Sequence, residues 1–295
     1  MASFYAPSGL YQPRAIFLTP LATAVVSAAL GALYAAFLVF RPEIFFKIPL
    51  LALWGFLSIV LSKWSIKINS IRAPLKAAVL VFIGSLAGYY VHLCFYCALA
   101  SAGKIVPGVT PFELSLIGSS FSFEAFKNFI SGPGELLEGV KRYYVFGFPD
   151  PSGIRELNPL YALVWLVEFV LYDAFIVVMG YVYAGEPYEE DMGDWLIKRK
   201  LERPFVTLPE DSKQASIVFN RLAEGDVSYF LTSRPEKKLK GSFLGLELFY
   251  SEGAPDACVT VRHYVKTLKR SSKTTVLEYL MIPEVQAERL MKRLD

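Results

Sequence analysis

The sequence predicts an α-helical membrane protein, with a four-span transmembrane bundle followed by a small cytosolic α+β domain. Hydrophobic residues make up 54% of the 295 residues and charged residues only 19%. Soluble domains contain about 45–50% apolar residues and about 25% charged residues. Four apolar segments reach the roughly 20 residues that cross a bilayer, namely 16–40, 44–62, 77–100 and 159–184. This composition excludes a disordered chain and a nucleic-acid binder driven by bulk charge.

Basic residues predict the orientation of the four segments. The short loop between the second and third segments carries four basic residues and no acid, and a second basic run follows the fourth segment. Cytoplasmic loops are enriched in lysine and arginine. We therefore predict an integral multi-pass protein of the inner or plasma membrane with both termini in the cytoplasm. The residues expected to contact lipid headgroups are Lys63, Lys67, Arg72, Lys76, Lys198, Arg199 and Lys200.

The outer loop 101–158 is too long to be a simple connector. Ser122 is a helix-cap candidate, Phe123, Phe126 and Ile130 follow at helical spacing, and glycine and proline end the pattern after Ser131. A second short helix is expected over 135–142, and 143–148 is strand-like or interfacial. The loop is interpreted either as helices lying on the membrane surface or as a docking site for an outer partner.

The tail divides into a juxtamembrane linker, 185–208, and a cytosolic domain, 209–295. Residues Val259, Val261 and Val265 alternate with polar residues, as expected of a half-buried strand. The predicted order is a helix that starts near Ser212, strands at 227–232, 242–250, 257–268 and 274–282, and a final helix at 284–294. Successive strands joined by short turns favour a four-stranded antiparallel sheet with helices on one face.

Three ionisable side chains inside the spans, His92, Glu168 and Asp173, carry the strongest functional signal. Such groups are costly at membrane depth and usually face a partner or a cavity. The helical rise of 1.5 Å per residue puts His92 and Glu168 both about 12–14 Å below the outer boundary, so the two could meet. Asp173 lies about 21 Å down. They form either a relay for protons or cations, or hydrogen bonds that hold helices together.

Small residues form rows that let helices approach closely. Gly84 and Gly88 make a GxxxG pattern, and His92 continues the same row. In the first span the comparable positions are Ala28, Gly31 and Ala32. We expect these rows to pack helices, with His92 pointing into the bundle or into a contact with a second copy or another membrane subunit.

The thiols of Cys94 and Cys97 form a CxxC near the outer end of the third span. Membrane thiol oxidoreductases that use such a pair need a second cysteine pair, and the third cysteine of this chain, Cys258, lies in the tail. His92 and Cys94 diverge by roughly 200° around a helix and cannot share a metal. We predict no metal site, no cofactor and no catalytic residues.

Three functions remain as hypotheses. The first is a scaffold or adaptor subunit of a membrane assembly, without catalysis, which couples a partner of loop 101–158 to a partner of the tail. The second is a proton- or cation-conducting subunit that uses the intramembrane acids. The third is a membrane thiol oxidoreductase. The expected partners are the lipid bilayer and copies of this chain or other membrane subunits; nucleic acid is not expected from a tail of balanced charge.

Overall fold

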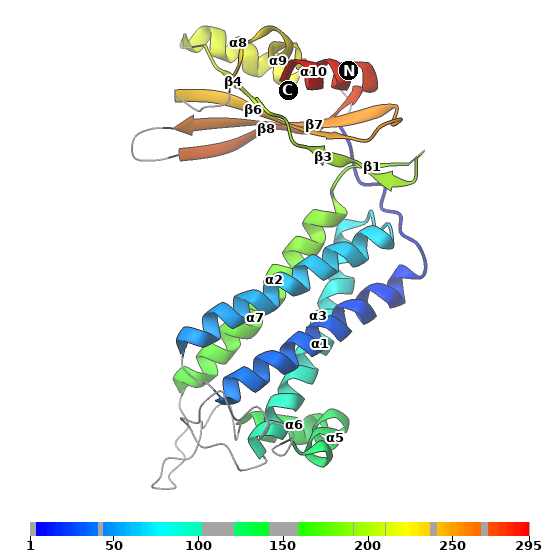
Figure 1. Cartoon of the computed structure of the whole chain (residues 1–295), viewed down its shortest axis with the longest axis vertical. Coiled ribbons are helices and arrows are strands. Elements are labelled where there is room, and N and C mark those ends of the chain that lie inside the picture. The colour runs from blue at the N-terminus through cyan, green and yellow to red at the C-terminus, as the bar shows by residue number, and fades with distance from the viewer. Residues whose placement is uncertain are drawn as a thin grey trace. The chain divides into compact units, whose positions relative to one another are not determined.

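The computed structural model describes residues 4–40, 44–101, 121–141, 159–190, 192–209, 211–236, 241–266 and 271–294. The chain forms two compact units. The helical unit is Gly9–Ala184, and the sheet unit combines Met1–Ser8 with Gly185–Asp295. Figure 1 traces the elements of both.

Four long helices make up most of the helical unit: α1 (Ala15–Phe40), α2 (Ile44–Ile68), α3 (Pro74–Ser101) and α7 (Pro159–Ala184). Each is long and apolar enough to cross a membrane. The four apolar segments of the sequence are confirmed as helices. The main difference is at α2, which continues six residues past the predicted end at 62 and so includes Lys63 and Lys67.

Small residues let α1 and α3 lie close together. A Cβ added to Gly84 would lie 2.6 Å from Thr23 Cβ, and one added to Gly88 would overlap the side chain of Ser27. A Cβ on Gly31 would lie 2.8 Å from His92 Cβ. The GxxxG row is thus used between two helices of the same chain. Of the other small residues predicted to pack, Ala28 borders Gly88 and both Ala28 and Ala32 are partly buried.

Two short helices, α5 (Phe123–Ser131) and α6 (Pro133–Val140), confirm the helices expected in the outer loop. Ser122 caps α5, since its Oγ accepts a hydrogen bond from Ala125 N at 3.1 Å. The α5 helix is fastened to α3 by the Tyr90 hydroxyl, which donates to Phe129 O at 3.0 Å. The segment 143–148 lies outside the described residues.

The sheet unit contains an antiparallel sheet in the order β5-β4-β6-β7-β8, with β3 also paired to β6. Three helices pack on one face (Figure 1), and their apolar residues share a core with β6, β7 and β8. The strands are β3 (Ile197–Arg199), β4 (Phe205–Thr207), β5 (Pro235–Glu236), β6 (Gly241–Tyr250), β7 (Asp256–Lys266) and β8 (Ser271–Pro283). The helices are α8 (Ser212–Ala223), α9 (Ser228–Thr232) and α10 (Glu284–Leu294).

Two details of the predicted sheet are wrong. The segment 227–232, expected as a strand, forms α9, because Asp226 Oδ1 accepts from Ser228 N at 2.8 Å and starts a helical turn that buries Phe230. The sheet has six strands rather than four. Of the three strands that were not predicted, β5 follows α9, and β3 and β4 come from 185–208, the segment expected as a linker. That segment also holds a small hairpin of β1 (Tyr188–Glu189) and β2 (Asp194–Trp195).

A bulge in β8 lets two of its leucines reach the same core. The register shifts so that Val259 pairs with Leu280 and Val261 with Leu277. Tyr279 takes a φ of 52° at this point, and its N donates to Thr260 Oγ1 at 3.2 Å. Both Leu277 and Leu280 therefore face the helices, although strict alternation would separate them.

The N-terminal segment completes the sheet unit at the free edge of β8. Phe4 bridges Leu280 in antiparallel fashion, and Tyr5 N donates to Tyr279 O at 2.8 Å. Tyr5 also packs against a small cluster with Phe249 and Cys258 on the face away from the helices. An exposed strand edge invites pairing with other chains, and this contact covers part of it.

Candidate functional site

Buried polar side chains run along the interior of the helical unit, and we call them the polar row. Its members are Thr19, Thr23, Ser27, Ser58, Ser62, Ser65, Asn69, Ser85, His92, Glu168 and Asp173, each at most 4% exposed. On α1 the members recur every four residues, which places them on one face. From Thr19 to Tyr34, which borders Glu168, α1 rises about 22 Å. This is most of the roughly 30 Å hydrocarbon core of a bilayer.

At one end of the polar row, hydroxyl and amide groups link α1 to α2. Asn69 Nδ2 donates to Thr19 Oγ1 at 3.2 Å and to Ser65 O at 2.9 Å. Ser65 Oγ donates to Thr19 Oγ1 at 3.3 Å. The end of the bundle next to the basic loop 63–76 therefore has polar side chains in its interior as well as on its surface.

The middle of the polar row joins all four long helices. The Tyr172 hydroxyl of α7 is hydrogen-bonded to Ser27 Oγ of α1, and it lies 3.2 Å from Ser58 Oγ of α2. Ser85 Oγ of α3 donates to Oδ1 of the next residue of α7, Asp173, at 2.6 Å. Three further oxygens at this level are buried and have no hydrogen-bond partner among the described residues: Thr23 Oγ1, Ser62 Oγ and Asp173 Oδ2.

His92 is fully buried at the centre of a group of aromatic rings. Its Nδ1 lies 2.7 Å from Gly31 O. Ring centroids of Tyr34, Trp54 and Tyr89 lie 5.4, 4.9 and 5.4 Å from the imidazole. Because a carbonyl oxygen only accepts, Nδ1 carries the hydrogen, and in the neutral ring Nε2 keeps the lone pair that can take a proton.

Glu168 and His92, whose matching depths predicted that they could meet, have Tyr34 as a common neighbour. Glu168 is 3% exposed, and its carboxyl group lies in electrostatic range of the Tyr34 and Tyr96 hydroxyls. The Tyr34 ring also packs on His92. Asp173 lies at a different level, beside Ser85, so the two acids act at separate points of the polar row.

The predicted thiol pair lies near the C-terminal end of α3. Cys94 and Cys97 are both free and fully buried. The Cys97 Sγ atom faces α6, since it lies 3.4 Å from where a Cβ on Gly139 would be. Within the described residues, no group of three or more His, Cys, Asp or Glu side chains could hold a metal ion.

Of the basic residues expected at the lipid headgroups, Lys63, Lys67, Arg72 and Lys76 lie in or beside the last turns of α2 and the start of α3, whereas Lys198, Arg199 and Lys200 belong to the sheet unit. Lys63 Nζ lies 4.4 Å from the centroid of the Tyr183 ring, and Lys76 Nζ lies 4.4 Å from that of Tyr11. Lys67 is in the last turn of α2. Arg72 holds the start of the helical unit through its backbone, since its N donates to Leu10 O at 2.9 Å.

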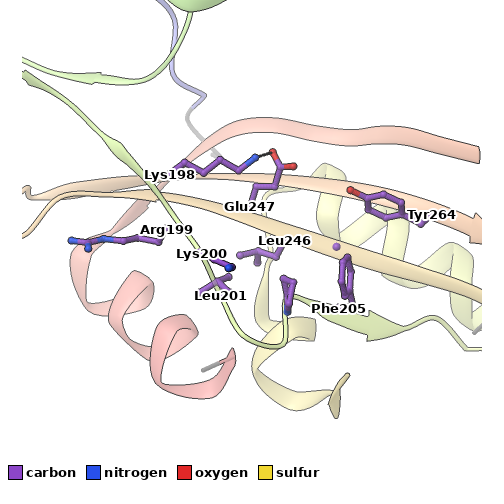
Figure 2. A pocket seen from close by; sticks show the side chains of 10 residues that line it. Lys198, Arg199, Lys200, Leu201, Phe205, Leu246, Glu247 and Tyr264 are labelled. Carbon is purple, nitrogen blue, oxygen red and sulfur yellow. Dashed lines mark ion pairs between the residues drawn. The ribbon is translucent and has the colours of Figure 1, made fainter. Parts of the chain in front are cut away.

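The sheet unit has a recess of its own, formed by β3, β4 and β6. Its cavity volume is about 190 Å³. Lys198, Arg199 and Lys200 line it together with Glu247, and the rings of Phe205 and Tyr264 form one side. Figure 2 shows these side chains around the recess and the ion pair of Lys198 with Glu247, 2.9 Å long.

Two further titratable groups of the sheet unit are explained by packing. His263 Nε2 lies 2.7 Å from Ser242 Oγ, and its ring meets Phe219 edge to face. Burial lowers the pKa of His263 below its usual value, which favours a neutral packing role. Burial also raises the pKa of the Cys258 thiol to about 12, helped by Asp256 and Glu189, so this thiol is unreactive near neutral pH.

The sequence reasoning found the three ionisable members of the polar row but missed its hydroxyl members. The available signal was their spacing: Thr19, Thr23 and Ser27 recur every four residues on α1, and Ser58, Ser62 and Ser65 recur every three or four on α2, with Asn69 following just after its end. Positions three and four apart share one helix face.

Comparison with known proteins gives no match, whether to a protein family, a curated protein or a solved structure. The functional argument therefore rests on the arrangement of the residues themselves.

Proposed function

We propose that the helical unit moves protons across a membrane along the polar row. What supports this is the row itself: its buried polar groups extend over most of the thickness of a bilayer, and three of them, His92, Glu168 and Asp173, can hold a proton. Ionisable groups inside membrane spans often mark proton relays.

The surroundings of His92 favour a proton over a hydrated cation. Aromatic rings pack around the imidazole with centroids 4.9–5.4 Å away, which suits transfer between neighbouring polar atoms rather than flow through a water-filled pore. In the proposed path, Glu168 and His92 exchange protons beside Tyr34. Along α1, the hydrogen-bonded hydroxyls of Tyr172, Ser27 and Ser58 lie between this level and the Asn69 end.

The test is proton flux through the purified full chain in liposomes that contain a pH-sensitive dye, with a potassium gradient and valinomycin to set the voltage. We expect the wild-type chain to acidify or alkalise the lumen faster than empty liposomes. The double variant Glu168→Gln, Asp173→Asn should fall to the rate of empty liposomes, because amides do not carry a proton on and off at neutral pH.

The matched control is Glu135→Gln, which changes an exposed acid of α6 outside the polar row. It should conduct like the wild type. A wild-type rate no higher than that of empty liposomes, or an undiminished rate in the double variant, would contradict the proposal.

The scaffold or adaptor function is the second candidate. It is favoured by exposed apolar side chains on the outer helices, where Phe123 of α5 is 72% exposed and Leu137 of α6 is 54% exposed. The α5 helix is hydrogen-bonded to α3 through Tyr90, and α6 packs near Cys97 of α3, so α3 supports both helices.

We expect the full chain, purified in mild detergent, to have a light-scattering mass above that of the 33.0 kDa monomer. The double variant Phe123→Ser, Leu137→Ser should return this mass to that of a monomer, because it removes the apolar contact surface. Phe56→Ser, an exposed apolar residue of α2, is the matched control. A monomeric wild-type chain with no bound subunit would count against the adaptor function.

A further inference from the structure

The recess of the sheet unit exists because two short strands share one partner. β3 pairs with β6 at Leu248–Tyr250, and β4 pairs with the same edge at Phe243–Gly245. The chain between them, 200–204, bows away from β6, and it returns where Leu246 N donates to Pro204 O at 2.9 Å. The bow leaves the 190 Å³ cavity beside Leu246 and Glu247.

One wall of the recess is aromatic, and Gly245 is what allows it. The Phe205 and Tyr264 rings meet nearly at right angles, with centroids 5.9 Å apart. A Cβ on Gly245 would lie 2.7 Å from Tyr264 Cε2 and 3.0 Å from the Phe205 ring. The glycine thus lets both rings lie directly against the strand, and Figure 2 shows the Tyr264 hydroxyl on the side of Glu247.

The charge of the recess is positive in spite of Glu247. Both carboxylate oxygens of Glu247 are already paired: Oε2 with Lys198 Nζ at 2.9 Å and Oε1 with Arg262 Nη1 at 3.1 Å. Lys200 lines the same cavity and has no ion pair among the described residues, and Arg199 adds a further cation at the rim. A ligand entering here meets unbalanced cations and a hydroxyl donor.

The size of the recess limits what that ligand can be. Pockets for drug-sized molecules measure about 300–1,000 Å³, and this cavity is smaller. It fits a compact anionic group and not, for example, a whole nucleotide. A phosphate group presents several acceptor oxygens, and lysine ammonium groups are common phosphate partners.

We propose that this recess binds a phosphate group, with Lys200 and Lys198 as its cations and the Tyr264 hydroxyl as a further donor. The phosphate belongs either to a lipid headgroup, since the sheet unit is tethered to the helical unit at Gly185, or to a small soluble phosphate ester. This site is independent of the proton path, because all its residues belong to the sheet unit.

The experiment is calorimetric titration of the full chain in maltoside detergent with three probes: inorganic phosphate, dihexanoyl phosphatidylglycerol and dihexanoyl phosphatidylcholine. The test variant is Lys198→Ala, Lys200→Ala, and the control is Lys213→Ala, an exposed lysine of α8. Circular dichroism checks that all variants keep the wild-type fold. Tyr264→Phe, which keeps the ring and removes the hydroxyl, serves as a second and milder variant.

We expect inorganic phosphate, phosphatidylglycerol or both to bind the wild type and Lys213→Ala. The double lysine variant should lose about tenfold or more in affinity, because charge-assisted bonds to phosphate are lost. Binding of phosphatidylglycerol alone assigns the site to an anionic headgroup, and binding of inorganic phosphate as well assigns it to the phosphate itself. If no probe binds, if phosphatidylcholine alone binds, or if the double variant binds like the wild type, the proposal is overturned.

Discussion

Replacing Gly88 with alanine is expected to destabilise the helical unit by about 1–3 kcal/mol, the usual cost of an overpacked core. The added methyl would overlap the Ser27 side chain and approach Ala28 N to 3.1 Å. Either α1 and α3 move apart or Ser27 leaves its hydrogen bond with Tyr172. Both responses weaken the contact on which the middle of the polar row depends. The midpoint of thermal unfolding of the full chain in detergent should fall.

The control is the same substitution at Gly55 of α2, where an added Cβ would meet nothing within 4 Å. Alanine is about 0.5–1 kcal/mol better than glycine inside a helix, so Gly55→Ala should leave the midpoint unchanged or raise it. The two variants differ only in the space around one methyl. Equal shifts for both would show that Gly88 is not a close-packing position.

Replacing His92 separates its structural role from its proposed role in proton transfer. Phenylalanine keeps a planar ring among Tyr34, Trp54 and Tyr89 and loses the hydrogen bond to Gly31 O, which contributes about 0.5–1.5 kcal/mol. Alanine removes the ring and leaves a cavity that costs about 3–5 kcal/mol in comparable aromatic truncations. We therefore expect His92→Phe to fold and His92→Ala to unfold at a clearly lower temperature.

Proton flux should respond differently from stability. The phenyl ring of His92→Phe has no nitrogen to accept a proton, so liposome flux should drop to the rate of empty liposomes although the bundle is intact. Unfolding midpoints and flux are measured on the same preparations. Wild-type flux in His92→Phe would remove the imidazole from the path and leave it a packing role.

The sequence predicted the long helices well because each one depends mainly on the residues of its own segment. An apolar run of the length of a bilayer predicts a helix whatever surrounds it, and the ends of α1 and α7 lie within one residue of their predicted positions. Ionisable members of the polar row were also visible, because Glu168 and Asp173 interrupt an apolar run. Serine and threonine were not, since a short hydroxyl side chain can bond its own helix backbone and is common in helices.

The sheet was harder to predict because its edges are decided by distant residues. The three long strands, β6, β7 and β8, follow from their alternating pattern. The pairing of β3 and β4 with β6, and of Phe4 with β8, depends on segments far away in the chain. The bulge at Tyr279 changes which leucines face the core, and a strict alternation of apolar and polar residues does not predict it.

The contact of Phe4 with Leu280 has a consequence for biosynthesis. The sheet unit is made of both ends of the chain, so the helical unit is an insertion within it. About 275 residues separate the two partners, which at roughly 5–20 residues per second takes about 14–55 s to translate. Through that interval Phe4 has no partner strand, because the helices are made before Leu280. The edge of β8 is therefore covered only after the helical unit has been synthesised.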